Sequence, residues 1–338
     1  MDYTDFADVL RDDAADCAIT AFPDGSIDMR YRVTDGADGH LPREEFGERI
    51  ASGESDTFSI DREERAMGGQ AVNMARQATE LGDTVHLYGY LDDPIFDSLA
   101  CETVSMGEPA TVYVYDFGSE VMLADNPDAM GEWSLATLRD AMGDTFKERM
   151  TADAICCANW ISFDGMTDAL SEIGELSLDG KYFVLDPGDL TGETQESVVS
   201  LCTALETLEQ SYDVVISTDG DETTYLAESL AVEVSDDAEE TLRRLGNELA
   251  VTGIVLHGSS EAIATTPDGM RSVPTIHIDG ETDLTGAGDR FGAGLAHGLA
   301  RDWEWDSALR LGNLCSSYHV EQVETGSRET LASYADSA

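Results

Sequence analysis

Basic residues are scarce in this sequence of 338 residues. It has 19 lysines and arginines against 69 aspartates and glutamates, so its formal net charge is −50. The only two lysines are Lys147 and Lys181. A protein that binds nucleic acid needs a basic stripe to meet the phosphates, and the sequence has none. This composition excludes the nucleic-acid-binding classes.

Long apolar runs and paired cysteine motifs are also missing. No run approaches the ~20 residues of a membrane-spanning helix, and the acidic segment 1–16 lacks the apolar centre of a signal peptide. None of the six cysteines forms Cys-x-x-Cys, and Cys156-Cys157 lies in an apolar run typical of a buried strand. We expect a cytoplasmic protein with no membrane partner and with buried thiols.

The acidic residues are spread along the whole chain instead of forming a tail. Because 42% of the residues are hydrophobic, the chain can still build a core. In molar salt the Debye length is about 3 Å, so repulsion between the carboxylates is largely screened. The composition therefore predicts a halophilic globular protein, as found in halophilic archaea.

Alternating strands and helices are predicted from about residue 134 onward. The strands fall at 154–160, 182–186, 213–217 and 253–257, and the helices at 135–146, 168–176, 193–210, 221–230, 236–250 and 306–323. This alternation is typical of a parallel sheet that helices cover on both faces. An earlier apolar run at 17–22 predicts another central strand.

A second, smaller sheet is predicted from segments nearer the N-terminus. Residues 26–33 alternate with period two, 57–60 is a short strand, and 110–117 and 120–125 flank a turn at Gly118-Ser119. We expect the polar segment 34–55 to be a loop. We predict one domain over 1–338, with the small sheet drawn from about 26–60 and 110–125.

A pair of glycines precedes a predicted helix at 71–81. Gly68 and Gly69 allow a ligand to approach the backbone closely, and Asn73 follows within the first turn. Gly82 is a good helix stop. The alternative is a glycine turn on an amphipathic core helix, with Asn73 on its wet side.

A second glycine motif follows a strand predicted at 273–278 and opens a helix over 287–299. Gly286, Ala287 and Gly288 leave backbone N–H groups at the helix N-terminus, where an anion binds well. Asp289 places a carboxylate one turn in. A base beside an anion cradle suits phosphoryl transfer to an alcohol. The alternative is a glycine turn leading into a capped helix.

The two motifs, in this order and about 200 residues apart, resemble the signatures of the PfkB (ribokinase-like) carbohydrate kinases. Those signatures read Gly-Gly-x-x-x-Asn-x-Ala with a later Leu-Gly, and Asp-Thr-x-Gly-Ala-Gly-Asp-x-Phe; the second begins here at Asp283, with Leu284-Thr285 in place of Thr-x. The resemblance covers about 17–326. It implies a Rossmann-type α/β fold with a β lid, and an ATP-dependent sugar kinase that uses Mg²⁺.

The resemblance also assigns roles to residues of the two motifs. Asp289 would be the general base, and Gly286, Ala287 and Gly288 would stabilise the transferred phosphoryl group. Gly68, Gly69 and Asn73 would contact the sugar, as would Asp28 on the lid strand, whose carboxylate can accept from two hydroxyls. The alternative for Asp28 is a solvent-facing strand residue. A homodimer through the lid strands is a further implication.

The nucleotide end departs from the family pattern in two places. Asp219 replaces the asparagine of Asn-x-x-Glu while Glu222 remains, and that glutamate would order Mg²⁺ through water. Leu256 replaces the threonine of Thr-x-Gly while Gly258 remains, so ATP and ADP stay open as donors. Asn313 matches a position beside adenine, or is a plain helical asparagine. A monovalent cation, K⁺, is a further cofactor that the resemblance allows, although the sequence does not assign a loop near Gly326 to it.

Seven arginines cluster between residues 30 and 76, although arginine is otherwise sparse. Arg30 and Arg32 share the polar face of the strand that carries Asp28. Because guanidinium suits phosphate oxygens, we expect a phosphorylated acceptor, with ribose 1-phosphate to ribose 1,5-bisphosphate as the specific hypothesis. Pairing of these arginines with nearby acids is the alternative. Free sugars, fructose phosphates and nucleosides stay open, as does a non-catalytic ligand-binding member.

Overall fold

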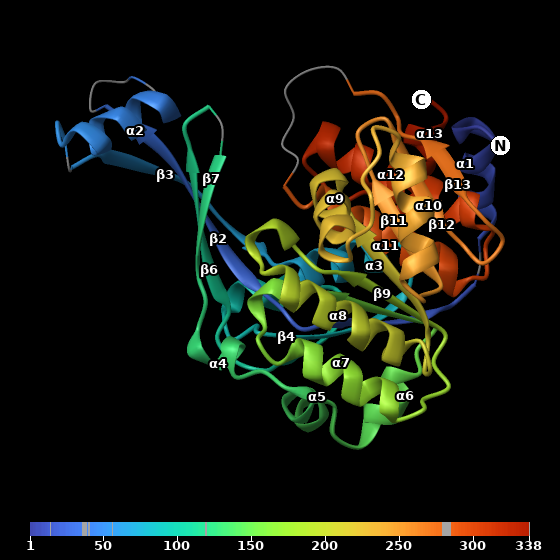
Figure 1. Cartoon of the computed structure of the whole chain (residues 1–338). Helices are drawn as coiled ribbons and strands as arrows, with labels where there is room; N and C mark the ends of the chain where they lie inside the picture. Colours follow the sequence, from blue (N-terminus) through green and yellow to red (C-terminus); the bar gives the residue numbers. More distant parts are fainter. Residues whose placement is uncertain are drawn as a thin grey trace.

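Two separate β-sheets organise the chain (Figure 1). The computed structural model describes residues 1–13, 15–35, 39, 41–55, 57–118, 120–278 and 285–337. Asp283 and Leu284 of the second motif and Ser119 of the predicted turn lie outside these ranges. No helix within them has the length and apolar character that a membrane span requires.

The large sheet is mostly parallel and its strands end on one side at the site described below. Among the described residues it has nine strands, in the order β13 (Arg271–Pro274), β12 (Glu261–Thr265), β11 (Gly253–His257), β10 (Asp213–Thr218), β9 (Tyr182–Asp186), β8 (Ala154–Ala158), β1 (Ala18–Phe22), β4 (Thr84–Gly89) and β5 (Glu102–Ser105). From β11 to β5 every neighbouring pair is parallel, while β12 and β13 form an antiparallel edge.

Helices cover both faces of this sheet. One face carries α5 (Leu135–Met142), α7 (Met166–Glu175), α8 (Gln195–Leu208), α9 (Gly220–Ser229) and α10 (Ala238–Glu248). The other face carries α3 (Gln70–Leu81), α11 (Ala287–Ala300) and α12 (Trp305–Gln322). The remaining helices are α1 (Tyr3–Asp12), α2 (Arg43–Ser52), α4 (Asp128–Gly131), α6 (Phe146–Met150) and α13 (Arg328–Ala335), and short 3₁₀ turns lie at Pro94–Ser98, Gly143–Thr145, Trp160–Ser162 and Leu190–Gly192.

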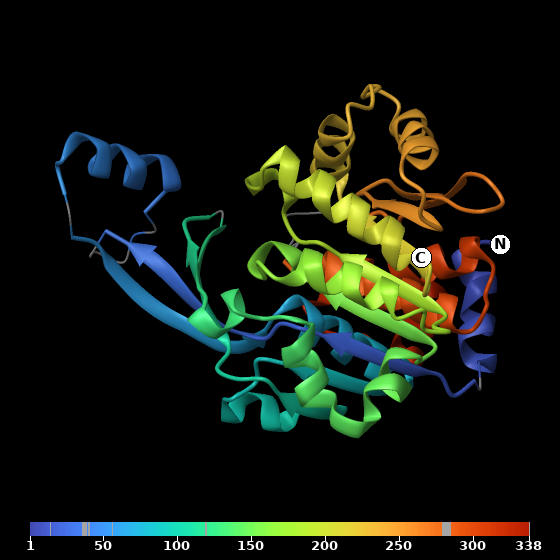
Figure 2. The same cartoon turned by 60° about the horizontal axis from the view of Figure 1, so that its bottom comes forward.

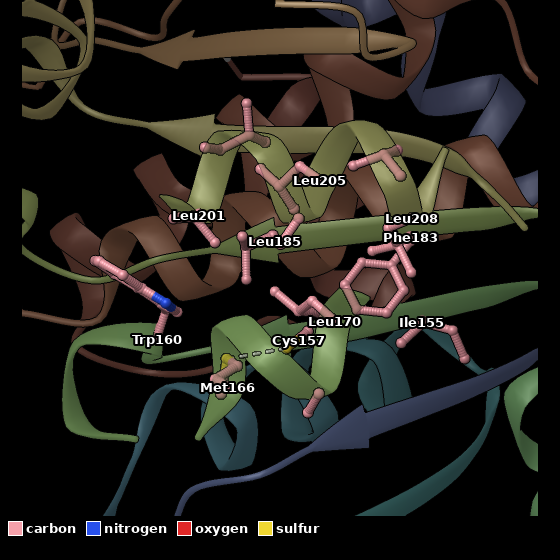
Figure 3. Packing of buried hydrophobic residues seen from close by; sticks show 14 of the residues in the cluster. Ile155, Cys157, Trp160, Met166, Leu170, Phe183, Leu185, Leu201, Leu205 and Leu208 are labelled. Carbon is pink, nitrogen blue, oxygen red and sulfur yellow. Dashed lines mark hydrogen bonds between the residues drawn. The ribbon is translucent and has the colours of Figure 1, made fainter. Parts of the chain in front are cut away.

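The two helical layers are held by the alternation of side chains along the buried strands. Ile155 and Cys157 of β8 face the α7–α8 side, while Cys156 faces α3 and α11. Figure 3 shows Leu201, Leu205 and Leu208 of α8 above Phe183 and Leu185 of β9, with Met166 and Leu170 of α7 beside them. Because successive strand residues point to opposite faces, a nearly continuous apolar strand serves both layers.

The small sheet projects from one side of the body, and we call it the lid (Figures 1 and 2). Its order is β3 (Ser59–Gly68), β2 (Ser26–Thr34), β6 (Ala110–Asp116) and β7 (Glu120–Asp125). The β2–β6 pair is parallel and the other two pairs are antiparallel. At its distal end α2 packs on the sheet through a small cluster that includes Phe46 and Phe117.

A buried ionic cluster ties the N-terminal segment to the helices. Arg301 Nε donates to Asp13 Oδ2 at 2.8 Å and Arg301 Nη1 donates to Asp83 Oδ1 at 2.6 Å. His297 Nδ1 lies 2.8 Å from the other oxygen of Asp83. Arg328 at the start of α13 donates to the Asp13 carbonyl. The cluster thus joins the ends of α1, α3, α11 and α13.

The structure confirms the predicted architecture and corrects several boundaries. Segment 34–55 is not only a loop, because it contains α2. Strand β3 runs on to Gly68, well past the predicted end at 60. The strand predicted over 273–278 stops at Pro274, where β13 leaves the edge of the sheet. Helices α1 and α13 and strand β5 had not been predicted.

Candidate active site

A cavity of about 840 Å³ lies at the carboxyl ends of the parallel strands. This is where open α/β sheets usually bind ligands. Asp186 ends β9, Asp219 follows β10, and His257 ends β11, and all three line the cavity. The predicted residues that line it are Asp219, Glu222, Gly258, Gly286, Ala287, Gly288, Asp289 and Asn313.

The N-terminus of α11 forms one wall of the cavity. Gly286 precedes the helix with φ of 75°, a left-handed conformation that favours glycine. A side chain there would also collide with Arg290, since a Cβ would lie 2.5 Å from Arg290 Nη1. The first turn therefore presents its N–H groups to the cavity, as an anion site requires.

A hydrogen bond joins the two sequence motifs. Asn73 Nδ2 of α3 donates to Asp289 Oδ2 of α11 at 2.8 Å. The two residues are 216 positions apart in the chain. Asn73 is therefore not a solvent-facing helical residue, and it fixes one oxygen of the carboxylate that stands at the anion cradle.

The N-terminus of α3 is held by a buried carboxyl group that the sequence reasoning missed. Asp24 accepts from the backbone N–H of Gln70 at 2.9 Å and of Ala71 at 2.6 Å, and from Asn159 Nδ2 at 3.0 Å. Burial raises the pKa of Asp24 to about 6, although these hydrogen bonds oppose the rise. Asp24 thereby caps α3 from the end of β1.

A second unpredicted carboxyl group, Asp186, faces the cavity. Gln70 Nε2 donates to Asp186 Oδ1 at 3.1 Å, and the backbone N–H of Gly188 donates to the same oxygen at 3.2 Å. Burial, and next the charge of Asp289, raise the pKa of Asp186 to about 7. Its position at the end of a buried parallel strand was the available signal.

Asp219 and Glu222 form a reciprocal cap on α9. The N–H of Glu222 donates to Asp219 Oδ1 at 2.9 Å, and the N–H of Asp219 donates to Glu222 Oε2 at 2.8 Å. Burial, and next the charge of Asp186, raise the pKa of Glu222 to about 8. Near neutral pH the pair Asp186 and Glu222 therefore retains protons unless a cation neutralises it.

Gly258 and Asn313, the residues predicted to contact the nucleotide at its adenine end, both line the cavity. The Asn313 side chain is buried, donating to the Val273 carbonyl at 3.2 Å and accepting from Thr275 at 3.3 Å. It is thus not an exposed helical residue. Burial lowers the pKa of His257, whose ring lies against Phe291 at a centroid distance of 5.1 Å. A neutral imidazole and Gly258 therefore face the cavity beside Asn313.

The predicted acceptor residues do not line this cavity; they lie at the base of the lid, next to its lining residues Gln70 and Asp289. Asp28 accepts from Ser26 Oγ at 2.7 Å, and burial raises its pKa above the usual value. A Cβ at Gly68 would come within 2.3 Å of both Asp28 oxygens, so the glycine makes room for that carboxylate. Gly69 follows with φ of 102° and leads directly into α3.

The lid arginines are paired with acids. Arg30 contacts Glu120 of β7, and Arg32 contacts Glu63 of β3. Arg65 Nη2 lies 2.7 Å from Asp93. This pairing, which we had considered as the alternative, removes the main reason for expecting a phosphorylated acceptor.

Comparison with known proteins agrees with this geometry. The family model of prokaryotic ketohexokinase matches residues 39–337. A ketohexokinase of Haloferax volcanii is 25% identical over 306 residues, which cover 86% of this chain and 81% of that protein.

Solved structures share the fold. The nucleoside kinase of Methanocaldococcus jannaschii, an archaeal member of the ribokinase family, superposes with a TM-score of 0.65 at 14% identity, covering 96% of this chain and all of that one. A fructokinase of Xylella fastidiosa with bound ATP gives 0.63 at 17% identity, covering 94% and 97%. With the family match over nearly the whole chain, these findings place the protein in the prokaryotic ketohexokinase family, as a sugar kinase with the ribokinase-like PfkB fold.

Proposed function

We propose that the protein transfers the γ-phosphoryl group of ATP to a hydroxyl of a free ketohexose such as fructose. The observation that carries the proposal is the Asn73–Asp289 hydrogen bond, which holds a carboxylate at the N-terminus of α11 between the acceptor residues and the cavity. The ketohexose comes from the name of the Haloferax relative and of the matching family. Ribose 1-phosphate has no support from either.

Asp289 is the general base in this proposal. One of its oxygens is held by Asn73, so the other can take the hydroxyl proton as the acceptor oxygen attacks phosphorus. The N–H groups of Gly286, Ala287 and Gly288 would stabilise the charge on the phosphoryl group in flight. Positioning and electrostatics are the main requirements of this reaction, and a weakly basic carboxylate suffices when the proton leaves late.

ATP would occupy the cavity with its adenine toward Asn313 and its phosphates toward α11. The cavity extends from Val320 and Asn313 to the first turn of α11, past His257 and Gly258. The neutral state of His257 adds no charge beside the nucleotide. The Xylella fastidiosa fructokinase of the same fold has bound ATP, which supports this donor over ADP.

Magnesium fits the acidic end of the cavity. Carboxylate oxygens are ligands that Mg²⁺ prefers. One oxygen of Glu222 accepts from the Asp219 N–H, so the other would hold Mg²⁺ through water. Among the described residues, no group of three or more His, Cys, Asp or Glu side chains forms a cage of its own. Bound there, Mg²⁺ would neutralise charge on the nucleotide phosphates. K⁺ dependence remains a prediction.

Asp28, Gly68, Gly69 and Asn73 would bind the ketohexose. Asp28 is half enclosed at the lid base and can accept from two hydroxyls, while the glycines let the sugar approach the backbone. Arg30 and Arg32, the two residues expected to bind a phosphate on the acceptor, are instead engaged with acids.

The test is a comparison of kcat/KM across acceptors in molar KCl with MgATP. Fructose should exceed ribose, adenosine, fructose 6-phosphate and ribose 1-phosphate, and ³¹P NMR of the product identifies the hydroxyl that was phosphorylated. Preference for a sugar phosphate or a nucleoside would refute the ketohexose assignment. Arg30→Ala should not alter the ratio of fructose to its phosphates.

A further inference from the structure

Arg290 follows the proposed base and is buried beside it. Only 4% of the residue is exposed. Its Nη1 donates to the carbonyl of Gly286 at 3.2 Å and lies 3.8 Å from Asp289 Oδ2. The side chain therefore folds back under the first turn of α11, behind the anion cradle.

The guanidinium is incompletely paired in that position. Arg290 Nε has no hydrogen-bond partner among the described residues. Burial lowers the pKa of Arg290 to about 10, and the charge of Asp289 opposes that change. An ion pair alone would explain neither the long 3.8 Å distance nor the orphaned donor, because buried guanidinium groups normally satisfy their N–H groups.

The two carboxylate oxygens of Asp289 differ in their contacts. Oδ2 accepts from Asn73 and faces Arg290, whereas Oδ1 has no hydrogen-bond partner in the part of the chain that the structure describes. An oxygen without a partner is the one that can receive the proton of an acceptor hydroxyl.

Buried ionisable groups, mostly carboxyl groups and arginines, surround Asp289 and Arg290. The ionisable groups whose charges reach Asp289 or Arg290 are Asp24 at the end of β1, Asp28 on β2, Arg76 on α3, Asp186 on β9, His257 on β11 and Cys315 on α12. Three of these are carboxyl groups whose pKa values burial raises. Arg290 places a positive charge among these carboxyl groups, 3.8 Å from Asp289 Oδ2.

We propose that Arg290 is a positioning residue for phosphoryl transfer: its positive charge lies beside Asp289 Oδ2 and, together with the Asn73 hydrogen bond, leaves Oδ1 turned toward the acceptor. This inference rests on the proposed role of Asp289 as the base. The second family signature leaves this position open, so the signature itself assigns Arg290 no role.

A double-mutant cycle tests the role of Arg290. It compares the native enzyme with Arg290→Met, Asp289→Asn and the double variant of these two, and Arg290→Lys is added as the variant that keeps the charge. We expect Arg290→Met to lower kcat by about tenfold to 100-fold with a smaller effect on the KM for MgATP, and Arg290→Lys to recover part of that loss. In the Asp289→Asn background, Arg290→Met should change kcat by less than about threefold, because its effect passes through that carboxylate.

The pH dependence of kcat/KM distinguishes an electrostatic role of Arg290 from a role in packing alone. In Arg290→Met the acid limb of kcat/KM should lie about one pH unit higher, because removal of a neighbouring positive charge makes a carboxylate harder to ionise. Arg290→Lys should keep the limb near its original place. If Arg290→Met does not fold, Arg290→Gln, which also removes the positive charge, takes its place in both measurements.

The outcomes separate this inference from the proposed function. Full activity in Asp289→Asn would overturn the base assignment and this inference together. A large loss in Asp289→Asn, combined with fully additive losses in the double variant and an unmoved acid limb in Arg290→Met, would overturn the role of Arg290 alone.

Discussion

At the scale of single residues, the proposed chemistry depends on Asp289. Asp289→Asn keeps the size of the side chain and an acceptor for Asn73, so we expect a folded protein that still binds MgATP. Loss of a general base typically lowers kcat by about 10²–10⁴-fold. Steady-state kinetics and ATP titration calorimetry check this, with exposed Asp268→Asn as the control. Native kcat in the variant would remove Asp289 from the catalytic step.

Asp24 gives a prediction about pH. Its folded-state pKa of about 6 is above the ordinary value of 3.8, so the folded state binds the proton more tightly than the unfolded state. Stability from this group is present below pH 4 and is lost as pH rises toward 6. A change of about two pKa units corresponds to roughly 3 kcal/mol.

The measurement is the free energy of unfolding of native protein and Asp24→Asn in molar KCl. The substitution should cost more at pH 4 than at pH 7, because only the native protein has this titrating group. At pH 7 it should cost about 1–3 kcal/mol, since an amide cannot accept from both Gln70 and Ala71. At pH 4 the cost should be larger by roughly 3 kcal/mol. A cost that grew with pH would contradict this account.

Sequence reasoning reached the site residues that sit in local motifs. Gly286 to Asp289 and Gly68 to Asn73 are short patterns, and the structure brings them together through Asn73 and Asp289. Asp24 and Asp186 were missed because their side-chain partners lie on other elements, and Arg290 was missed because the family signature leaves its position open. Asp24 contacts residues 46 and 135 positions away, which no local pattern reveals.

At the scale of elements, the correctly predicted segments have a clear apolar pattern and the missed ones do not. Strands β9 and β11 were predicted with correct bounds because they are continuous apolar runs between polar turns. Helix α2 was missed because none of its residues is buried, so its sequence shows no apolar stripe. Its Gly47 also weakens helix propensity.

The ionic cluster at Arg301 should be a major contributor to the attachment of α1. The side chains of Arg301 and Asp83 are 1% and 0% exposed. Arg301→Met would leave Asp83 and Asp13 without their main cation, and breaking a buried pair costs about 3–5 kcal/mol. Thermal unfolding measures this, and Arg243→Met, which breaks the exposed pair with Glu240, should change little. Equal effects of the two variants would argue against the cluster.

At the scale of the whole molecule, net charge dominates. With a formal charge of −50, we expect the midpoint of thermal unfolding to fall steeply as KCl is reduced from molar to millimolar concentration, because the Debye length grows and carboxylate repulsion is no longer screened. Sucrose at matched osmolality is the control, since it adds no ions. Undiminished stability in salt-free buffer would contradict the halophilic interpretation.

The face of the lid opposite Asp28 is the surface on which we propose that two copies associate. Tyr113 lies directly across from Leu123, so both side chains share that face, and the ring of Tyr31 stacks on Tyr113 at 6.5 Å. Leu123 is 56% exposed. Sedimentation velocity in molar KCl should show a dimer that Leu123→Asp dissociates, whereas Leu176→Asp, just after the end of α7, should leave the dimer intact. A native monomer would remove this proposal.

The junction between lid and body has a mechanical consequence. Only Gly69 separates β3 from α3, and a Cβ there would lie 2.8 Å from Gly25 Cα in the turn from β1 to β2. The crossings from β1 to β2 and from β3 to α3 therefore touch each other close to Asp28 and Asn73. Because β3 extends ten residues at about 3.3 Å each from this junction, a small rotation there would displace the far end of the lid by a much larger distance.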